Sequence, residues 1–138
     1  MRQVPPAQLV LYAHGSRDAR WRATFEHLTA VTASQVGPEA VRLAYLELSE
    51  PTLAAIAERA ARAGLVRLRV LPLFFAPGKH VRDDVAARVD EARAQNPQLE
   101  IELLPSVGED ERMRSLLRDL ASEAATRPWI GATRRGTE

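Results

Sequence analysis

Hydrophobic residues in this chain occur either in short continuous runs or in stripes at helical spacing. Segments 9–13 and 70–75 are apolar throughout, which is typical of strands that a parallel sheet buries on both faces. Between such runs, apolar residues recur every three or four positions, as on the buried side of a helix. The alternation predicts strands at 9–13, 41–47, 66–75 and 99–104, and helices at about 18–34, 50–64, 81–96 and 109–125.

Residues with strong local preferences support the predicted helix ends. Asp18 can cap the first helix, and Gly37 can close it. Pro51 suits a first helical turn, because its missing N–H group would have no partner there, and Gly64 can end that helix. The helical stripes consist, in chain order, of Trp21, Phe25, Leu28 and Thr32; Leu53, Ile56 and Ala60; Val81, Val85 and Val89; and Met113, Leu116, Leu117 and Leu120.

The alternation of strands and helices predicts an α/β protein. Right-handed crossovers between parallel strands place helices on both faces of the sheet. We therefore expect a flavodoxin-like three-layer sandwich around a small four-stranded parallel sheet. A length of 138 residues, 46% of them hydrophobic, is enough for one domain and too short for two ordinary ones. We assign residues 1–126 to this domain and 127–138 to a flexible C-terminal tail.

The composition excludes several kinds of site and partner. Nineteen basic and eighteen acidic residues give a formal charge of +1, so no overall field favours nucleic acid. The chain has no cysteine, which rules out disulfides, thiolate metal ligands and a cysteine nucleophile. The apolar run near the amino end has only five residues, too few for a signal peptide or a membrane span. We expect a soluble cytoplasmic protein with no membrane partner.

Two histidines stand just beyond predicted strands. His14 directly follows the first strand and His80 follows the third, with Gly15 and Gly78 close to them. Because the carboxyl ends of parallel strands meet at one edge of a sheet, we expect both imidazoles at the same crevice. One histidine alone could simply hydrogen-bond a turn, but two such strand ends favour a shared site. Imidazole at this position can bind a metal ion or transfer a proton.

Carboxylates and basic groups accompany the histidines. Glu47 ends the second strand between apolar neighbours, and Glu50 follows at the next helix start. A carboxylate is seldom buried without a partner, so Glu47 is the better candidate ligand. Two imidazoles and one carboxylate leave coordination positions open, as catalytic metal sites do. Hydroxyl and positive groups suited to an anionic ligand flank the histidines at Ser16, Arg17, Lys79 and Arg82.

Three segments of the chain together resemble one known family. They are Ala13-His14-Gly15-Ser16-Arg17, Tyr45-Leu46-Glu47-Leu48-Ser49-Glu50-Pro51-Thr52 and Phe74-Phe75-Ala76-Pro77-Gly78-Lys79-His80-Val81-Arg82-Asp83-Asp84. In this order and spacing they resemble the small (CbiX-type) sirohydrochlorin cobaltochelatases, which are class II chelatases. The resemblance runs from 9 to about 125. It implies a chelatase-like fold, a homodimer, and a lyase that inserts a divalent metal into sirohydrochlorin without ATP or an organic cofactor.

The resemblance also implies roles for individual residues. His14 would be a metal ligand and proton acceptor, His80 a metal ligand, and Glu47 a carboxylate that assists at the metal. The residues in contact with the tetrapyrrole would be Glu50, Phe75, Ala76, Pro77, Gly78 and Lys79. Cobalt is the expected metal. Iron and nickel stay open, because the chain lacks the histidine-rich and cysteine-containing segments of some relatives. The choice between cobalamin and siroheme biosynthesis also stays open. Ala86 stands where the family often has proline.

Three other functions are compatible with parts of the pattern. A non-catalytic carrier of the metal or the tetrapyrrole would use the same ligands. A histidine-dependent hydrolase fits less well, because Ala13 stands where histidine phosphatases have arginine, and the sequence Gly-x-Ser-x-Gly does not occur. A dinucleotide-binding domain would require Gly-x-Gly-x-x-Gly after the first strand, and this motif is absent there.

Overall fold

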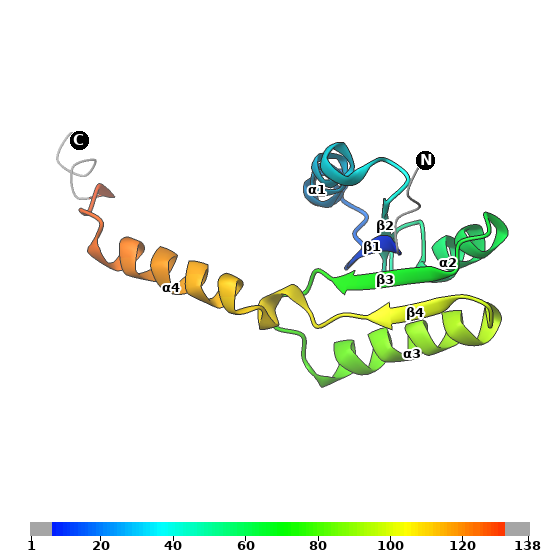
Figure 1. Ribbon diagram of the computed structural model, residues 1–138. Helices are drawn as coiled ribbons and strands as arrows, with labels where there is room; N and C mark the ends of the chain where they lie inside the picture. The colour runs from blue at the N-terminus through cyan, green and yellow to red at the C-terminus, as the bar shows by residue number, and fades with distance from the viewer. Residues whose placement is uncertain (1–6, 132–138) are drawn as a thin grey trace.

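The computed structural model describes residues 7–131, which form a four-stranded sheet with helices around it (Figure 1). The strands are β1 (Gln8–Ala13), β2 (Val41–Tyr45), β3 (Arg67–Pro72) and β4 (Glu100–Leu103). The helices are α1 (Ala19–Val36), α2 (Leu53–Arg62), α3 (Lys79–Gln95) and α4 (Glu111–Thr126), with a 3-10 turn, η1 (Val107–Glu109), before α4. All strand pairs are parallel, in the order β2-β1-β3-β4. The predicted α/β fold with a small parallel sheet is confirmed.

Each predicted strand and helix is present, and the differences lie at the ends. Strand β2 stops at Tyr45, short of the predicted end, because the chain turns sharply there. Helix α2 begins at Leu53, later than predicted, because the Thr52 side chain caps it. Strand β3 ends at Pro72, so the last residues of the predicted strand belong to the loop that leads to α3. These shifts lengthen the loops at the carboxyl edge of the sheet.

Helices α2 and α3 cover one face of the sheet and form the main core with it. Leu53, Ile56 and Ala60 of α2 are buried, as predicted, and so are Val85 and Val89 of α3. The strand residues of this core are Val10, Tyr12, Ala44, Leu68, Val70 and Ile101. Right-handed crossovers place α1 on the opposite face, where it lies against β2 (Figure 1). Three layers therefore form over the β1–β2 half of the sheet.

Helices α1 and α4 bury much less of their surface. The predicted Asp18 cap of α1 is confirmed, since its carboxylate accepts from the Arg20 N–H at 2.9 Å. The stripe on α1 is only partly covered, with Trp21 and Leu28 respectively 38% and 42% exposed. None of the residues of α4, all of which are described, is buried. Figure 1 shows α4 extending away from the sheet, beyond the carboxyl ends of the strands, so it adds no layer to its own chain.

The predicted C-terminal tail lies only partly within the described residues. Residues 127–131 of the predicted tail follow α4, and residues 132–138 of that tail lie outside the described residues. Across residues 7–131, no helix is long and apolar enough to cross a membrane.

Candidate functional site

His14 and Glu47 meet at the carboxyl edge of the sheet. His14 follows β1 directly, and Glu47 lies just beyond β2, the neighbouring strand. The His14 Nδ1 and Glu47 Oε1 atoms are 3.0 Å apart, a hydrogen-bond distance. The two side chains are 43% and 42% exposed, so the pair stays accessible to a ligand. The fold therefore brings two of the three predicted metal ligands into contact.

The loops that carry this pair are held together by close backbone contacts. Gly15 packs so tightly on the turn after β2 that a Cβ atom there would overlap the carbonyl oxygen of Glu47. Ser49 joins the same two loops. Its hydroxyl accepts from the Ser16 N–H at 3.0 Å and donates to the Ser16 carbonyl oxygen at 2.8 Å. These contacts set the distance between the two loops and hence between His14 and Glu47.

The turn after β2 has a strained backbone. Leu48 has a φ of 63°, a left-handed conformation that few residues other than glycine adopt. Within the turn, the Ser49 N–H donates to the Glu47 carbonyl oxygen at 2.8 Å. The side chain of Leu48 is 62% exposed, so its burial does not explain the conformation. Strain of this kind tends to occur at functional sites, and here it places Glu47 and Ser49 against the loop after β1.

Phe74 supports the His14 ring from within the core. The ring centroids are 4.5 Å apart, with an interplanar angle of 58°, and Phe74 is buried. Tyr12 packs edge-on against Phe74 from β1. Burial raises the pKa of Tyr12 to about 12, so its phenol stays neutral near pH 7 and is not a proton acceptor. Phe74 is not among the predicted site residues, and its place near the end of the apolar segment 70–75 is the signal that points to it.

His80 lies outside the His14–Glu47 pair. It is the second residue of α3, after the N-cap residue Gly78, and it is exposed. Within residues 7–131, no three His, Asp or Glu side chains are close enough to hold a metal ion together. A closed three-ligand centre is therefore not preformed among these residues. The metal-ligand roles of His14, Glu47 and His80 stay predictions.

The predicted polar contacts to substrate have different surroundings. Arg17 is exposed, and the Ser16 hydroxyl already accepts a hydrogen bond from the backbone before α1. Lys79 and Arg82 pair with carboxylates of α3 and η1 at 3.0 and 3.6 Å. Since such exposed ion pairs are weak, an anionic ligand can replace the carboxylates. Glu50 is exposed and lines a separate pocket at the start of α2.

The loop between β3 and α3 is an open part of the site. Phe75 is 57% exposed, Ala76 and Gly78 are also exposed, and Pro77 is half-buried. The residues that line an open pocket of about 360 Å³ beside this loop include Phe74, Pro77 and Arg82. The predicted tetrapyrrole contacts in this loop are thus accessible to a large ligand.

Replacing Ser49 with alanine is expected to lower the free energy of unfolding by about 1–2 kcal/mol, because one hydroxyl makes two hydrogen bonds between loops. The measurement is urea unfolding at neutral pH. Ser34→Ala is a matched control, because the Ser34 hydroxyl bonds only the backbone of its own helix. Equal midpoints for the two variants would contradict the role given to Ser49.

Comparison with known proteins adds independent evidence. The CbiX family model matches residues 8–124 of this chain. A sirohydrochlorin cobaltochelatase of Methanopyrus kandleri is 32% identical over 77 residues, which cover 56% of this chain and 54% of that protein. The chain therefore spans about half the length of this curated relative.

Solved structures agree with the predicted chelatase-like fold. A CbiX protein assigned to cobalamin biosynthesis in Marinobacter aquaeolei VT8 has a TM-score of 0.75 and 39% identity, over 88% of this chain and 96% of that one. The sirohydrochlorin chelatase SirB of Bacillus subtilis subspecies spizizenii, in complex with cobalt, has a TM-score of 0.66 and 25% identity, over 76% of this chain and 45% of SirB. Since the family match extends from β1 into α4 and includes both the His14–Glu47 pair and the loop before α3, this chain belongs to the CbiX family.

Proposed function

We propose that this chain inserts a divalent metal, with cobalt the first choice, into the tetrapyrrole sirohydrochlorin without ATP or an organic cofactor. The observation that carries the proposal is the 3.0 Å pairing of His14 with Glu47 at the open sheet edge of a CbiX-family domain. The relative from Methanopyrus kandleri bears the name of this activity, and SirB has been solved with cobalt. The reaction is that of a lyase forming nitrogen–metal bonds, in cobalamin- or siroheme-type biosynthesis.

The pairing assigns a defined role to each nitrogen of His14. Each divalent ion that enters the ring displaces two pyrrole protons, so the site needs a proton acceptor. Glu47 can only accept when ionised, so His14 donates its Nδ1–H to the carboxylate and carries its lone pair on Nε2. Nε2 can take the first pyrrole proton, pass it to water and then take the second, and Glu47 stabilises the imidazolium each time. One lone pair cannot bind the metal and the proton together, so His14 performs its two roles in succession.

A site with few protein ligands suits a metal ion that is a substrate, because the ion must leave the protein for the ring. His14 and Glu47 offer nitrogen and oxygen to a divalent transition ion, and His80 would add a second imidazole from α3. The described residues contain no closed group of three such ligands. A sealed set of protein ligands would hold the ion against transfer. We propose that these three residues hand the ion to the ring in sequence.

The surrounding surface suits an anionic macrocycle with acetate and propionate arms. Arg17 is exposed beside His14, and Lys79 and Arg82 stand in the first turn of α3. The backbone N–H groups of that turn also favour anions. Exposed Phe75 offers a flat apolar face to the ring. The proposed substrate contacts are Ser16, Arg17, Glu50, Phe75, Ala76, Pro77, Gly78, Lys79 and Arg82.

We also propose the cellular form of the protein. Residues 1–126 are the single domain, two copies form a homodimer, and the compartment is the cytoplasm. Sirohydrochlorin or a related tetrapyrrole is the partner, with no role for nucleic acid or membrane.

The test of the function is a turnover assay. The purified chain is mixed with Co²⁺ and excess sirohydrochlorin under anaerobic conditions without nucleotide, and the absorbance of the ring is followed. We expect many rings to be metallated per chain, faster than in a protein-free sample. Parallel reactions with Fe²⁺ and Ni²⁺ rank the metals.

Two other outcomes would contradict the proposed enzyme. Metallation limited to one ring per chain would identify a carrier, which uses the same ligands without turnover. A rate equal to that of the protein-free sample would exclude both insertion and delivery.

A further inference from the structure

The half of the sheet formed by β3 and β4 has one uncovered face. Helix α1 lies over β2 on that face, while α2 and α3 cover the opposite one (Figure 1). The uncovered face carries half-buried Leu71 near the carboxyl end of β3 and Leu104 just after β4. Towards the amino ends it carries two Arg–Glu pairs between the strands, at 3.0 and 2.8 Å. Parallel sheets are almost always covered on both faces, and the described part of the chain leaves this half uncovered.

Helix α4 has an apolar side that is largely uncovered by the rest of the described chain. Leu116 and Leu120, both on its apolar side, are each 51% exposed. Its main contacts are with η1. A helix of 16 residues is about 24 Å long, close to the length of about 20 Å of a six-residue strand such as β3. One α4 therefore has the length and the polarity needed to cover the open half of a sheet.

The junction before α4 directs the helix away from its own sheet. Gly108 of η1 packs so closely on the loop after β3 that a Cβ atom there would overlap the carbonyl oxygen of Phe75. The next residues are also held, because Asp110 caps α4 and accepts from the Arg112 N–H at 2.9 Å. Asp110 itself is extended, with φ −74° and ψ 132°. These contacts hold the turn before α4 in place, and the turn sets the direction in which α4 extends.

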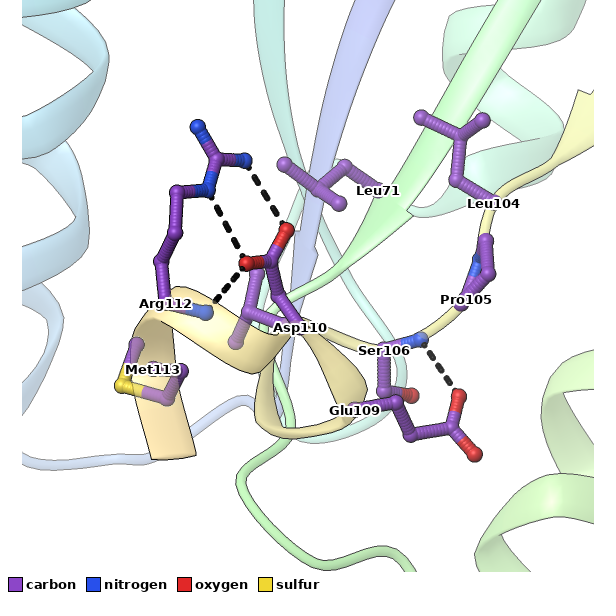
Figure 2. Close-up of a pocket in the computed structure, with 9 residues that line it drawn as sticks. Leu71, Leu104, Pro105, Ser106, Glu109, Asp110, Arg112 and Met113 are labelled. Atoms are coloured by element: carbon purple, nitrogen blue, oxygen red, sulfur yellow. Dashed lines mark hydrogen bonds and ion pairs between the residues drawn. The ribbon is translucent and has the colours of Figure 1, made fainter. Parts of the chain in front are cut away.

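An apolar pocket lies where the base of α4 meets the uncovered face. Its volume is about 640 Å³. Figure 2 shows Leu71 and Leu104 on the sheet side of this pocket and Met113 on the helix side. The pocket continues the uncovered face towards the candidate site, so a helix that lies on β3 and β4 would also fill it.

The accessible surface of the chain is larger than that of a compact protein of the same mass. The chain exposes 10086 Å², whereas a compact protein of 15.3 kDa exposes about 7,100 Å². The chain therefore exposes more surface than a compact protein of its mass, and a typical stable interface buries roughly 800 Å² per partner. This chain also spans only 45% of SirB, so one SirB chain has room for two units of this size.

We propose that two copies of this chain exchange their α4 helices, so that each α4 lies across the open β3–β4 half of the other copy, beside its α1. The contact is isologous, because each copy supplies one helix and one open sheet half. The two carboxyl edges then face each other, and each copy encloses the candidate site of the other. This inference deepens the homodimer proposed above and rests on it.

The absence of cysteine makes cross-linking a direct test. Leu71→Cys and Leu120→Cys chains, carrying different affinity tags, are co-expressed and treated with a short bis-maleimide. We expect a covalent dimer that contains both tags, and a mass of two chains for the untreated wild type by light scattering. The matched control pairs Leu120→Cys with Arg88→Cys on α3, which faces the other side of the sheet, and should give no such dimer.

Each alternative arrangement has its own result. A Leu71→Cys/Leu120→Cys double variant that cross-links only within one chain would show that α4 folds back, which overturns the exchange. A wild-type dimer without the Leu71–Leu120 cross-link would overturn the exchange and leave the homodimer standing. A wild-type monomer would overturn both. A cross-linked dimer that fails to insert cobalt would contradict the proposed function alone.

Discussion

Replacing His14 with alanine is expected to lower the rate of cobalt insertion by at least about 100-fold and to change the free energy of unfolding by less than about 1 kcal/mol. Its Nε2 atom is the proposed proton acceptor and metal ligand. The side chain is 43% exposed and lies on the outer side of Phe74, so its removal leaves a gap that is open to solvent and no enclosed cavity. The measurements are the initial rate in the anaerobic absorbance assay and the urea midpoint of the same sample.

Two further variants test whether the loss of rate is specific to the His14–Glu47 pair. Glu47→Gln keeps the size of the side chain but removes the charge that stabilises the imidazolium, so a rate loss in the same direction is expected. His27→Ala removes an exposed histidine of α1 that has no proposed role, and it should insert cobalt at the wild-type rate. A wild-type rate for His14→Ala would remove His14 from the mechanism.

Replacing Gly15 with alanine is expected to destabilise the protein by about 3 kcal/mol or more, because the new Cβ atom would overlap the Glu47 carbonyl oxygen. The overlap involves backbone on both sides, and neither loop can yield without breaking the contacts of Ser49 with Ser16. The loss should appear as a lower urea midpoint. Cobalt insertion in the fraction that folds should also fall, because the same overlap separates His14 from Glu47.

Gly78→Ala is the matched control for stability. Gly78 lies at the same edge of the sheet, but no atom is within 4 Å of the place where its Cβ would lie, and its φ of −73° suits any residue. Its unfolding free energy should drop by no more than about 1 kcal/mol, the cost of a poorer N-cap residue. If Gly15→Ala unfolds at the same urea concentration as Gly78→Ala, the close approach of Gly15 to Glu47 is not present in solution.

The elements of the fold could be predicted because burial imposes a local pattern. Strand β1 needs a continuous apolar run, and α2 needs apolar residues at helical spacing such as Leu53 and Ile56. The ends were predicted less well. Both Glu50-Pro51 and Thr52 are acceptable helix starts, and only the conformation of the preceding turn selects Thr52.

The sequence predicts at which edge of the sheet the candidate site lies. His14 and Glu47 each lie at or just beyond a strand end, and neighbouring parallel strands end close together at the same edge of the sheet. His80 is separated from β3 by a loop of several residues, whose path has no sequence signature. The contacts of Phe74 and Ser49 with the site were not predicted, since each depends on the turn of a different loop.

The amino-acid sequence alone predicts the fold class, the succession of strands and helices, and the resemblance to a chelatase family, because periodicity and short motifs are local properties of the chain. The folded structure is needed to show that His14 contacts Glu47 without His80, that Gly15 and Ser49 hold their loops together, and that α4 points away from its own sheet. The physical reason is the same for all three. Each depends on backbone dihedral angles in loops and on contacts between distant segments, which no local pattern of apolar and polar residues encodes.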